Sequence, residues 1–581
     1  MVFKPMGWVP QLPEVPDTVP ICEFMLDEKN GRSPFAESKP AYTCGLTGKS
    51  ISAAQQKKDV DSLSRALAKE FGWKVNEGTE YDKVAGVFAL NTIDIMTLNW
   101  SLHRLNGVSS PANAAYNADE LRHQLTNSGS KVLFTVMPLL QTALDAAAKS
   151  NIPKDKIYIC EMPNDPPIPK EFKTLAQLTK EGESLPELEP VKWEKGQGAR
   201  QTAFLCYSSG TSGLPKGVMI SHRNVIANTL QISLYDKPAR DALGGPNYQD
   251  VALGLLPQSH IYALIVICHA STYRGDQVII LPRFELNHYL NAIQTYKINT
   301  LLIVPPIIIA MVKNREATKK FDLSSVTSIF TGAAPLGKET AEELASQYPE
   351  WNIRQGYGLT ETCTVVCSTT PQDIWFGSSG CLIPGYEAKV MSAEGNEITG
   401  YNQPGELLVK SPSVVLGYLK NDKATQETFV DMPEGRFMRT GDEVEIRVSP
   451  KTGNEHVWVV DRIKELIKVK GLQVAPAELE ACLLNHPSVA DCAVIPVQDD
   501  RAGEVPKAFV VKSKSVGLED NDALVKRDIS KYVEKEKARH KWLAGGVEFI
   551  DVIPKSPSGK ILRRLLRDKE REARRKAAAK L

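Results

Sequence analysis

The 581-residue sequence has few cysteines and no ordered pattern among them. Its 10 cysteines run from Cys22 to Cys492 without a CxxC pair or a Cys/His group at zinc-ligand spacing. The nearest pair, Cys363 and Cys367, has the spacing of two thiols on one helix face. The sequence therefore predicts reduced thiols in an intracellular protein, without a disulfide framework.

A long apolar run is also missing. The longest, residues 301–312, is interrupted by Pro305 and Pro306, whereas a bilayer-spanning helix needs roughly 20 residues. The opening stretch MVFKPMGWVPQLPEVP is rich in proline and lacks the apolar centre of a signal peptide. We expect a soluble protein with no leader and no transmembrane segment.

An excess of charge of either sign is absent too, because 70 Lys and Arg face 69 Asp and Glu. No overall field then attracts nucleic acid or anionic lipid. Local groups must bind any polyanion, which favours a small phosphorylated ligand and argues against a nucleic-acid partner.

Alternating strand-like and helical stretches predict an α/β fold. The apolar runs are residues 84–90, 131–136, 299–304 and 328–330, and the helical periodicity covers residues 60–71, 118–125, 310–316 and 338–348. The first 50 residues look like an irregular lead-in. We expect a large N-terminal domain that contains two α/β subdomains with largely parallel sheets.

The character of the sequence changes after Gly377. Strand-like segments separated by turns then predict a small β-rich subdomain. From Asp461 the basic stretch DRIKELIKVKG leads into a compact α/β pattern that ends in a charged helix after Ile561. We therefore expect an N-terminal domain of residues 1–460 and a small α/β C-terminal domain of residues 461–581.

The strongest functional signal is YSSGTSGLPKGV, residues 207–218. Glycines let backbone N–H groups approach a phosphate closely, and the hydroxyls and Lys216 add donors and charge. A Walker loop requires G-x-x-x-x-G-K-[ST], but Pro215 precedes Lys216 here and Gly217 follows it. A flexible surface loop is the alternative. Because the segment also holds Leu-Pro-Lys-Gly between two apolar, extended stretches, we interpret it as a phosphate-binding loop.

Five further segments complete a pattern: TGAAPLG (331–337), QGYGLTET (355–362), RTGD (439–442), DRIK (461–464) and PKSPSGKILRR (554–564). Together with residues 207–218 they resemble, in order, the motifs of the adenylate-forming acyl-CoA synthetases, firefly luciferases and nonribosomal adenylation domains. The sequence looks most like plant 4-coumarate:CoA ligases and fungal phenylacetyl-CoA ligases, from about residue 50 to about residue 570.

The resemblance implies an ATP-dependent acid:CoA ligase. The large domain would bind ATP and the acid, and the small domain would be mobile. In the cleft between them a carboxylic acid would react with ATP and Mg²⁺ to give acyl-AMP, and the acyl group would then pass to coenzyme A.

By resemblance, one set of residues binds the nucleotide. Tyr357 stacks on adenine, and Asp442 and Arg462 contact the ribose, whose two hydroxyls a carboxylate can accept. Glu361 holds Mg²⁺ as a hard oxygen ligand and is catalytic. Without the family match, Tyr357 would be interpreted as a core aromatic and Asp442 as a turn former. The other predicted ATP or AMP contacts are Ser208, Ser209, Gly210, Thr211, Ser212, Lys216, Ala333, Gln355, Gly356, Thr360, Lys464, Lys468 and Lys560, of which Thr211, Lys216 and Lys560 are also catalytic.

In the C-terminal domain, Lys560 would bridge the carboxylate and the α-phosphate during adenylation. An isolated lysine in a basic tail would be solvated and inert, but the preceding SPSG turn favours the catalytic role. Asp461 falls at the family's hinge, where rotation would present Lys470 and Gly471 to coenzyme A. Arg283 stands where the plant ligases carry a CoA-contacting lysine, so the charge is kept but its shape differs.

The acid site follows from PQSHIYALIV, residues 257–266, and from small residues elsewhere. His260 is predicted to be catalytic there, although it could equally be a structural histidine. The plant enzymes have Met-Phe where this chain has Gln258-Ser259, so their substrate range is not transferred. Aryl acids of the phenylacetate, cinnamate or 4-coumarate type rank first, and medium-chain fatty acids second. The predicted acid contacts are His260, Ile261, Tyr262, Val266, Gly332, Ala333, Gly356 and Val365.

The final residues Ala579-Lys580-Leu581 resemble an SKL-type peroxisomal address. They predict recognition by the peroxisomal import receptor and a location in the peroxisomal matrix. A chance AKL would leave the protein in the cytoplasm.

Two other classes compete with a CoA ligase. A CoA-independent adenylating enzyme of the amino-acid-activating kind carries an aspartate in the segment aligned with PQSHIYAL, and none is present there. A luciferase-like oxygenase shares every motif and stays open. A non-catalytic nucleotide-binding scaffold would have lost one of Lys216, Glu361 and Lys560, but the sequence retains all of them.

Overall fold

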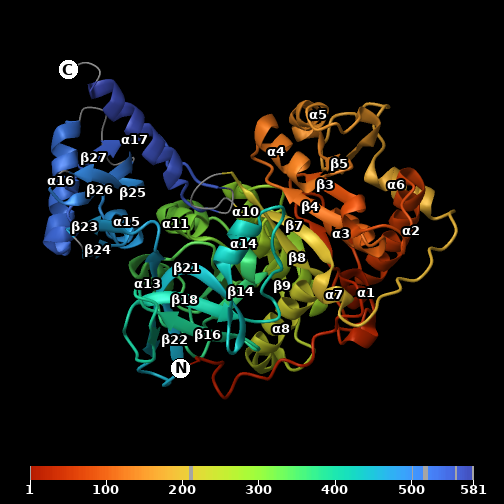
Figure 1. Cartoon of the computed structure of the whole chain (residues 1–581), viewed down its shortest axis with the longest axis horizontal. Coiled ribbons are helices and arrows are strands. Elements are labelled where there is room, and N and C mark those ends of the chain that lie inside the picture. Colours follow the sequence, from red (N-terminus) through yellow and green to blue (C-terminus); the bar gives the residue numbers. More distant parts are fainter. Residues whose placement is uncertain are drawn as a thin grey trace.

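The computed structural model describes residues 2–208, 214–470, 472–499, 501–513, 521–556 and 559–578. Three β-sheets belong to a large N-terminal body, and a fourth belongs to a smaller C-terminal domain. In Figure 1 this domain, coloured blue, stands at one side of the N-terminal body. Among the described residues, no helix combines the length and the apolar character that crossing a bilayer requires.

The first α/β subdomain contains a seven-stranded sheet in which β7, β4, β3, β5 and β6 run parallel. The antiparallel strands β8 and β19 complete one edge. In sheet order the strands are β19 (Gly417–Tyr418), β8 (Lys216–Ser221), β7 (Thr202–Ser208), β4 (Val108–Ala112), β3 (Val84–Phe88), β5 (Val132–Thr135) and β6 (Ile157–Ile159). The helices of this part are α2 (Ala53–Phe71), α3 (Ile95–Arg104), α4 (Ala118–Ser128), α5 (Leu140–Ala148), α6 (Leu175–Gly182) and α7 (Gln197–Arg200).

The second α/β subdomain contains a nine-stranded sheet, parallel from β13 to β1. Its strands, in sheet order, are β15 (Cys381–Leu382), β14 (Thr364–Ser368), β13 (Asn352–Leu359), β12 (Ser328–Thr331), β11 (Thr300–Ile303), β9 (Val251–Gly254), β10 (Gln277–Ile280), β1 (Tyr42–Cys44) and β2 (Ser50–Ile51). Its helices are α8 (His222–Gly244), a π-helix (Ala263–Ala270), α9 (Ser271–Tyr273), α10 (Leu286–Tyr296), α11 (Pro305–Lys313), α12 (Arg315–Thr318) and α13 (Lys338–Gln347).

A six-stranded antiparallel sheet forms the β-rich subdomain. Its strands are β17 (Glu397–Ile398), β16 (Glu387–Met391), β18 (Gly405–Lys410), β21 (Gly435–Val448), β20 (Phe429–Met432) and β22 (Glu455–Arg462), with helix α14 (Asp422–Thr428) beside them. The N-terminal lead-in packs here: Phe3 pairs with Ala388, and the Trp8 indole donates a 3.0 Å hydrogen bond to Asn454. This irregular stretch contains the short helix α1 (Ile21–Leu26), a 3-10 helix at Glu28–Asn30, and the strands β1 and β2, of which β2 is the edge strand of the nine-stranded sheet.

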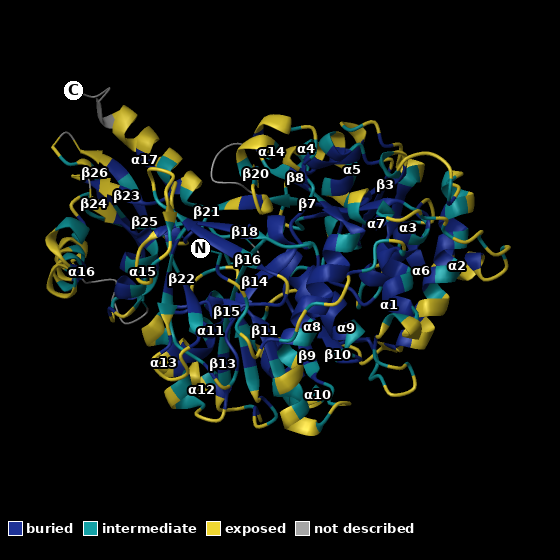
Figure 2. Ribbon diagram, turned by 60° about the horizontal axis from the view of Figure 1, so that its bottom comes forward, coloured by how far each residue is buried: buried dark blue, intermediate teal, exposed yellow. Residues whose placement is uncertain are grey.

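The C-terminal domain is built on a five-stranded sheet of β24 (Leu472–Val474), β23 (Ile467–Val469), β26 (Gly503–Lys512), β25 (Val489–Asp499) and β27 (Val547–Phe549). Its helices are α15 (Pro476–Leu484), α16 (Asp522–Glu536) and α17 (Arg563–Ala578). Figure 2 shows α16 and α17 largely exposed, whereas β25 is mostly buried. The Lys313 ammonium of α11 donates to the carbonyls of Val489 and Ala490 at 3.0 and 2.9 Å, which ties the domain to the N-terminal body.

Local sequence explains where the long helices begin. The Ser52 hydroxyl accepts from the Gln55 N–H at the start of α2. Ser221 and Asn224 exchange two hydrogen bonds, of 2.8 and 3.2 Å, as a capping box for α8. Gly72 ends α2 in the left-handed conformation, which glycine adopts at little cost.

The predicted fold class is confirmed, with parallel sheets, a β-rich subdomain and a small C-terminal domain. The prediction for Cys363 and Cys367 is wrong: Cys367 lies in β14 and Cys363 lies just before it, because an extended chain pairs here with β13. All 10 cysteines are free and buried. The domain boundary at Asp461 stays a prediction; β22 ends at Arg462 and β23 begins at Ile467.

Candidate active site

A cleft of about 1120 Å³ lies between the N-terminal body and the C-terminal domain. The carboxyl ends of β7, β12 and β13 border it, and these ends are where open α/β sheets bind ligands. The predicted site residues that line the cleft are Ser208, Lys216, His260, Ile261, Tyr262, Gly332, Ala333, Gly356, Tyr357, Thr360, Glu361, Val365, Arg462, Lys464 and Lys560.

On the nucleotide side, Tyr357, Asp442 and Arg462 form one unit. The Tyr357 hydroxyl donates to Asp442 Oδ2 at 2.5 Å, and Arg462 Nε lies 3.4 Å from Asp442 Oδ1. Burial raises the pKa of the Asp442 carboxyl, although Arg462 and the Tyr357 hydroxyl both favour its ionised form. The predicted adenine and ribose residues therefore meet although they come from three separate motifs.

The path of β13 explains how Tyr357 reaches this position. β13 pairs in parallel with β12 as far as Gln355 and then antiparallel with β14, with a register shift between Tyr357 and Gly358. A Cβ atom on Gly358 would lie 1.5 Å from the Thr364 carbonyl oxygen, so no side chain fits. Such a register shift changes the direction in which the neighbouring side chains of the strand point.

Glu361 lines the cleft beside Ser208 at the end of β7. Its Oε1 accepts hydrogen bonds from the Tyr418 hydroxyl at 2.9 Å and from the Ser208 hydroxyl at 3.2 Å. Lys216 Nζ lies 4.8 Å from the centre of the Tyr418 ring. No other described residue is recorded as a donor to Glu361, which leaves Oε2 as a hard oxygen ligand, so the site fits a magnesium ion. Tyr418 was missed from the sequence, since a Gly-Tyr pair on its own carries no recognisable motif.

Lys560 enters the cleft from the C-terminal domain on a short loop. Lys555 bridges to Ile561, and the Ser556 hydroxyl accepts from the Lys560 N–H at 3.1 Å. Gly559 has φ +83°, and a Cβ there would meet Pro306 at 3.0 Å, so this position requires glycine. This arrangement seats the loop on the N-terminal end of α11.

The electrostatics of Lys560 differ from those of a surface lysine. Burial, together with the nearby Arg462, lowers the pKa of Lys560 to about 8, while Glu465, Glu361 and Asp442 oppose that shift. Arg563 holds the base of the loop through ion pairs to Glu465 at 2.6 Å and Glu480 at 2.7 Å. The ammonium thus lies among the carboxylates of the nucleotide side.

The acid side of the cleft is mostly apolar. The Tyr262 hydroxyl donates to the Phe330 carbonyl at 2.7 Å, and the two rings meet edge to face at 6.0 Å. His260 Nδ1 accepts from the Tyr262 N–H at 3.3 Å, and burial with the nearby Lys560 lowers the pKa of His260 to about 4. His260 therefore presents a neutral imidazole to the cleft.

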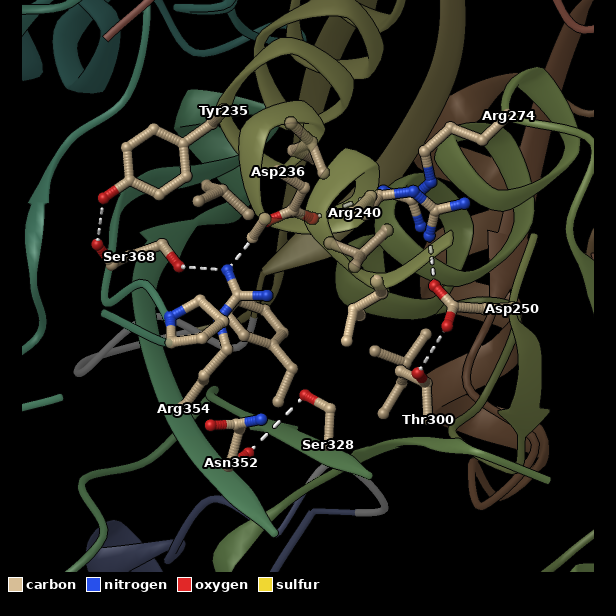
Figure 3. A pocket seen from close by; sticks show the side chains of 18 of the residues that line it. Tyr235, Asp236, Arg240, Asp250, Arg274, Thr300, Ser328, Asn352, Arg354 and Ser368 are labelled. Atoms are coloured by element: carbon tan, nitrogen blue, oxygen red, sulfur yellow. Dashed lines mark hydrogen bonds and ion pairs between the residues drawn. The ribbon is translucent and has the colours of Figure 1, made fainter. Parts of the chain in front are cut away.

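Some predicted residues lie elsewhere. Val266 lies behind the cleft wall and lines a second cavity (Figure 3). Asp442 and Gln355 lie just behind the lining, and Asp461 accepts from the Ala477 N–H at 3.1 Å. Arg283, Lys468 and Lys470 are exposed away from the cleft, so their predicted contacts stay predictions. Ser209, Gly210, Thr211, Ser212, Gly471 and Ala579-Lys580-Leu581 lie outside the described residues.

Elsewhere, Asp373, Cys381 and His456 are close enough to hold a metal ion. The Asp373 carboxylate already accepts from Ser449, Thr452, Asn454 and His456, at 2.5 to 3.0 Å. This network is internally satisfied and connects parts of the fold, so we assign it a structural role.

Comparison with known proteins agrees with this geometry. The family model described as "AMP-binding enzyme" matches residues 33–419, and the model of the "AMP-binding enzyme C-terminal domain" matches residues 478–560. The acyl-CoA ligase easD of Emericella nidulans is 39% identical over 98% of this chain and 100% of its own length. The acyl-CoA ligase gloD of Glarea lozoyensis is 38% identical over 97% of this chain and 98% of its own.

Solved structures share the fold. The anthranilate CoA ligase AuaEII, in complex with anthranoyl-AMP, superposes with a TM-score of 0.79 at 21% identity, over 96% of this chain and 98% of that one. ATP-bound MatB from Rhodopseudomonas palustris gives 0.76 at 23% identity, over 95% and 99%. Family models and full-length relatives thus agree with the site: the chain belongs to the adenylate-forming AMP-binding enzymes, and within them to the AMP-forming acyl-CoA ligases.

Proposed function

We propose that this ligase activates a carboxylic acid with ATP as an acyl-adenylate and transfers the acyl group to coenzyme A. The observation that carries the proposal is the meeting of Lys560 with Glu361 and Arg462 in one cleft, with Asp442 just behind its lining. A carboxylate is a poor electrophile, so exchange of one oxygen for a better leaving group must precede thioester formation.

In the first step a carboxylate oxygen of the acid attacks the α-phosphorus of ATP and pyrophosphate leaves. Charge builds on the phosphate oxygens, and the groups placed to meet it are Lys560, Lys216 and Arg462. A lysine ~4 Å from a phosphate contributes about 4 kcal/mol gross at an effective dielectric near 20. The neutral His260 adds no charge that would pull the carboxylate away from the phosphorus.

Glu361 is the residue we propose to hold Mg²⁺, oriented by Tyr418 and Ser208. When bound, the ion would neutralise phosphate charge and order the β- and γ-phosphates.

In the second step the sulfur of coenzyme A attacks the acyl carbon, AMP leaves, and the thiol proton passes to solvent. We propose that the small domain first rotates about Asp461, which withdraws Lys560 and brings Lys468, Lys470 and Gly471 toward the cleft. The exposed positions of Lys468 and Lys470 leave them available for this second orientation. Arg283 is the proposed contact for a CoA phosphate.

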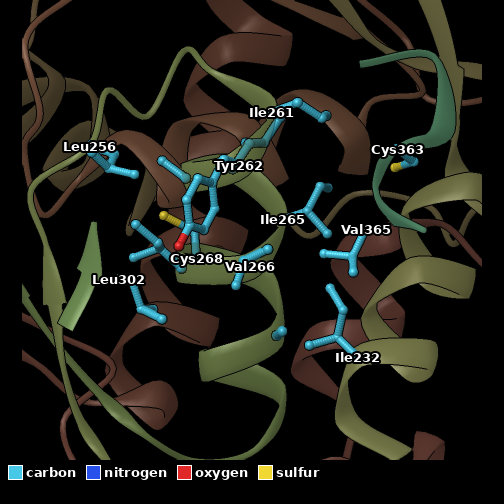
Figure 4. Close-up of a cluster of buried hydrophobic side chains, with 14 of the residues drawn as sticks. Ile232, Leu256, Ile261, Tyr262, Ile265, Val266, Cys268, Leu302, Cys363 and Val365 are labelled. Atoms are coloured by element: carbon cyan, nitrogen blue, oxygen red, sulfur yellow. The ribbon is translucent and has the colours of Figure 1, made fainter. Parts of the chain in front are cut away.

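For the acid we propose an aryl type, phenylacetate or cinnamate-like. Gly332 and Ala333 are small residues of the cleft lining, and Tyr262 and Phe330, whose ring packs against Gly356, provide aromatic walls. A medium-chain fatty acid is the second candidate. The observation that favours it is the apolar character of Val365, which lines the cleft, and of Val266, which packs behind that wall (Figure 4).

The peroxisomal location is a proposal that rests on the sequence of Ala579-Lys580-Leu581 alone. A fluorescent protein fused ahead of the chain should collect in peroxisomes, and deletion of these three residues should release it to the cytoplasm. An unchanged distribution on deletion would contradict the proposal.

The ligase proposal is tested with the purified protein, ATP, Mg²⁺ and CoA. The acids are phenylacetate, cinnamate, 4-coumarate, benzoate and octanoate, and thioester is measured by its absorbance and mass. Turnover of an aryl acid supports the proposal with its first acid class, and turnover of octanoate alone moves the class to fatty acids. Release of AMP without thioester for every acid would contradict the CoA step. It would indicate a CoA-independent or luciferase-like adenylating enzyme instead.

A further inference from the structure

Lys560 lies on a narrow hairpin, here called the lysine hairpin (residues 554–562, described except at 557 and 558). The Ser556 N–H donates to the Lys560 carbonyl at 2.8 Å, and the Leu562 N–H donates to the Pro554 carbonyl at 2.8 Å. Both bonds lie inside the hairpin. They fix its shape, but they leave its direction relative to the rest of the C-terminal domain open.

An ion pair joins the first arm of the lysine hairpin to the sheet of the C-terminal domain. The Lys555 ammonium contacts both carboxylate oxygens of Asp491, at 2.8 and 2.6 Å. Asp491 lies on β25, and the pair is partly exposed, with 21% and 31% of the two side chains accessible. Exposed ion pairs contribute little to stability, so the main effect of this contact is on the direction of the arm.

Arg563, at the start of α17, joins the second arm to the same domain. Its guanidinium pairs with Glu465 at 2.6 Å and with Glu480 at 2.7 Å, and its Nε donates to the Val494 carbonyl at 3.2 Å. These acceptors belong to the turn after β22, to α15 and to β25. Because a guanidinium is a rigid, planar fork, three acceptors on separate elements hold it in one orientation.

The lysine hairpin shares its strand with the contact between the two domains. Lys313 of the N-terminal body donates to the carbonyls of Val489 and Ala490, which directly precede Asp491 on β25. One short stretch of β25 therefore contacts both the N-terminal body and the hairpin. Docking of the small domain and the direction of the Lys560 ammonium are coupled through it.

We propose that Lys555 and Arg563 are positioning residues for adenylation. They hold the lysine hairpin by its two arms, so that the Lys560 ammonium meets the carboxylate and the α-phosphate. The inference rests on the proposed ligase function. All the carboxylates that hold the hairpin follow the predicted hinge at Asp461, so they turn with the small domain. The thioester step, from which Lys560 is withdrawn, should not depend on them.

The test measures the two half-reactions separately in Lys555→Met, with an acid of the panel above that the wild type converts. Acid-dependent pyrophosphate release should fall by roughly ten- to a hundredfold, because a displacement of about 1 Å costs that much in a reaction that depends on orientation. Thioester formation from the added acyl-AMP and CoA should keep the wild-type rate. Lys555→Arg keeps the charge and should restore most of the pyrophosphate release.

Asp491→Asn separates positioning from direct binding of a phosphate. This variant frees the Lys555 ammonium, which lines the cleft. If the ion pair positions the hairpin, Asp491→Asn should slow pyrophosphate release as much as Lys555→Met does, and the double variant should be no slower than either. Unchanged or faster release in Asp491→Asn would mean that Lys555 binds a phosphate itself, and would overturn the positioning role.

Arg563→Lys tests the second arm. A lysine keeps the charge but cannot bridge Glu465 and Glu480 as the guanidinium does, so the adenylation step alone should slow. Lys569→Met is the matched control, because Lys569 pairs with Glu548 at 2.9 Å on an exposed part of α17 and should alter neither step.

The partly exposed Lys555 pair keeps the test open if Arg563→Lys does not fold, since Lys555→Met disturbs no buried charge. Wild-type pyrophosphate release in Lys555→Met, or equal slowing of both half-reactions, would overturn the positioning role while the ligase function stands. A wild-type protein that yields neither pyrophosphate nor thioester with any acid would overturn both.

Discussion

The Tyr357 hydroxyl donates a 2.5 Å hydrogen bond to the Asp442 carboxylate, which Arg462 approaches from its other oxygen. A hydrogen bond thus joins the ring of Tyr357, which should cover adenine, to the carboxylate of Asp442, which should hold the ribose. If these residues bind the nucleotide as proposed, binding should depend on the bond between them as well as on each residue alone.

Removal of this bond should weaken ATP binding. Tyr357→Phe keeps the ring and should raise the KM for ATP by roughly five- to tenfold, because the carboxylate loses one charge-assisted hydrogen bond. Asp442→Asn removes the charge and should raise it further. Initial rates against ATP concentration at saturating acid and CoA measure both. An unchanged KM in Asp442→Asn would remove Asp442 from the ribose site.

The adenylation rate should fall at alkaline pH. Lys560 is needed as a cation, and burial with Arg462 lowers its pKa to about 8, so its charge is lost as pH rises through that value. This alkaline fall should appear in the pH profile of kcat/KM for ATP, which reports the free enzyme. In the pH profile of kcat it should move to higher pH, because bound phosphates favour the charged form of Lys560. His260, with a pKa of about 4, adds no step near neutrality. In Lys560→Arg this alkaline fall of the rate should vanish. If the fall persists, it belongs to the titration of another group.

Tyr418 should tune the magnesium requirement, since its hydroxyl orients Glu361 Oε1 at 2.9 Å. Loss of such an outer partner weakens metal binding roughly ten- to a hundredfold, so Tyr418→Phe should shift the half-saturating Mg²⁺ concentration upward by that factor. Rates against MgCl₂ at fixed ATP measure the shift. Tyr401→Phe, which removes an exposed hydroxyl bonded to Glu455, is the control. Equal curves for both variants would contradict the role of Glu361.

Lys313 should favour the domain orientation seen here. Its ammonium caps two carbonyls, Val489 and Ala490, of the C-terminal domain. Lys313→Met should slow acid-dependent pyrophosphate release by roughly tenfold and leave thioester formation from added acyl-adenylate unchanged. Lys320→Met, at an exposed position on the same segment, should alter neither step. Equal slowing of both half-reactions by Lys313→Met would assign the lysine a general structural role.

Much of the fold and of the cleft could be predicted because the relevant signals are short and contiguous. Apolar runs placed β3, β11 and β12, and residues 355–362 carried Tyr357 and Glu361 together. Contacts between distant segments could not be predicted. The Tyr418–Glu361 bond joins residues 57 positions apart, and Phe3 pairs with Ala388.

The second cavity could not be predicted either. It arises from the cross-strand register that aligns Thr300, Ser328 and Asn352, and periodicity within one strand says nothing of register. The error at Cys367 has the same origin. A five-residue strand was mistaken for a helix face because its pairing with β13 is set by the tertiary structure.

The most direct measurement separates the two half-reactions in wild type and Lys560→Ala. Pyrophosphate release is followed with ATP, Mg²⁺ and an accepted acid, and thioester formation is followed separately from chemically prepared acyl-AMP and CoA. We predict that Lys560→Ala loses pyrophosphate release by roughly 10²–10³-fold and keeps the thioester step. A Lys560→Ala variant that releases pyrophosphate at the wild-type rate, or a wild type that makes no thioester from acyl-AMP, would contradict the account.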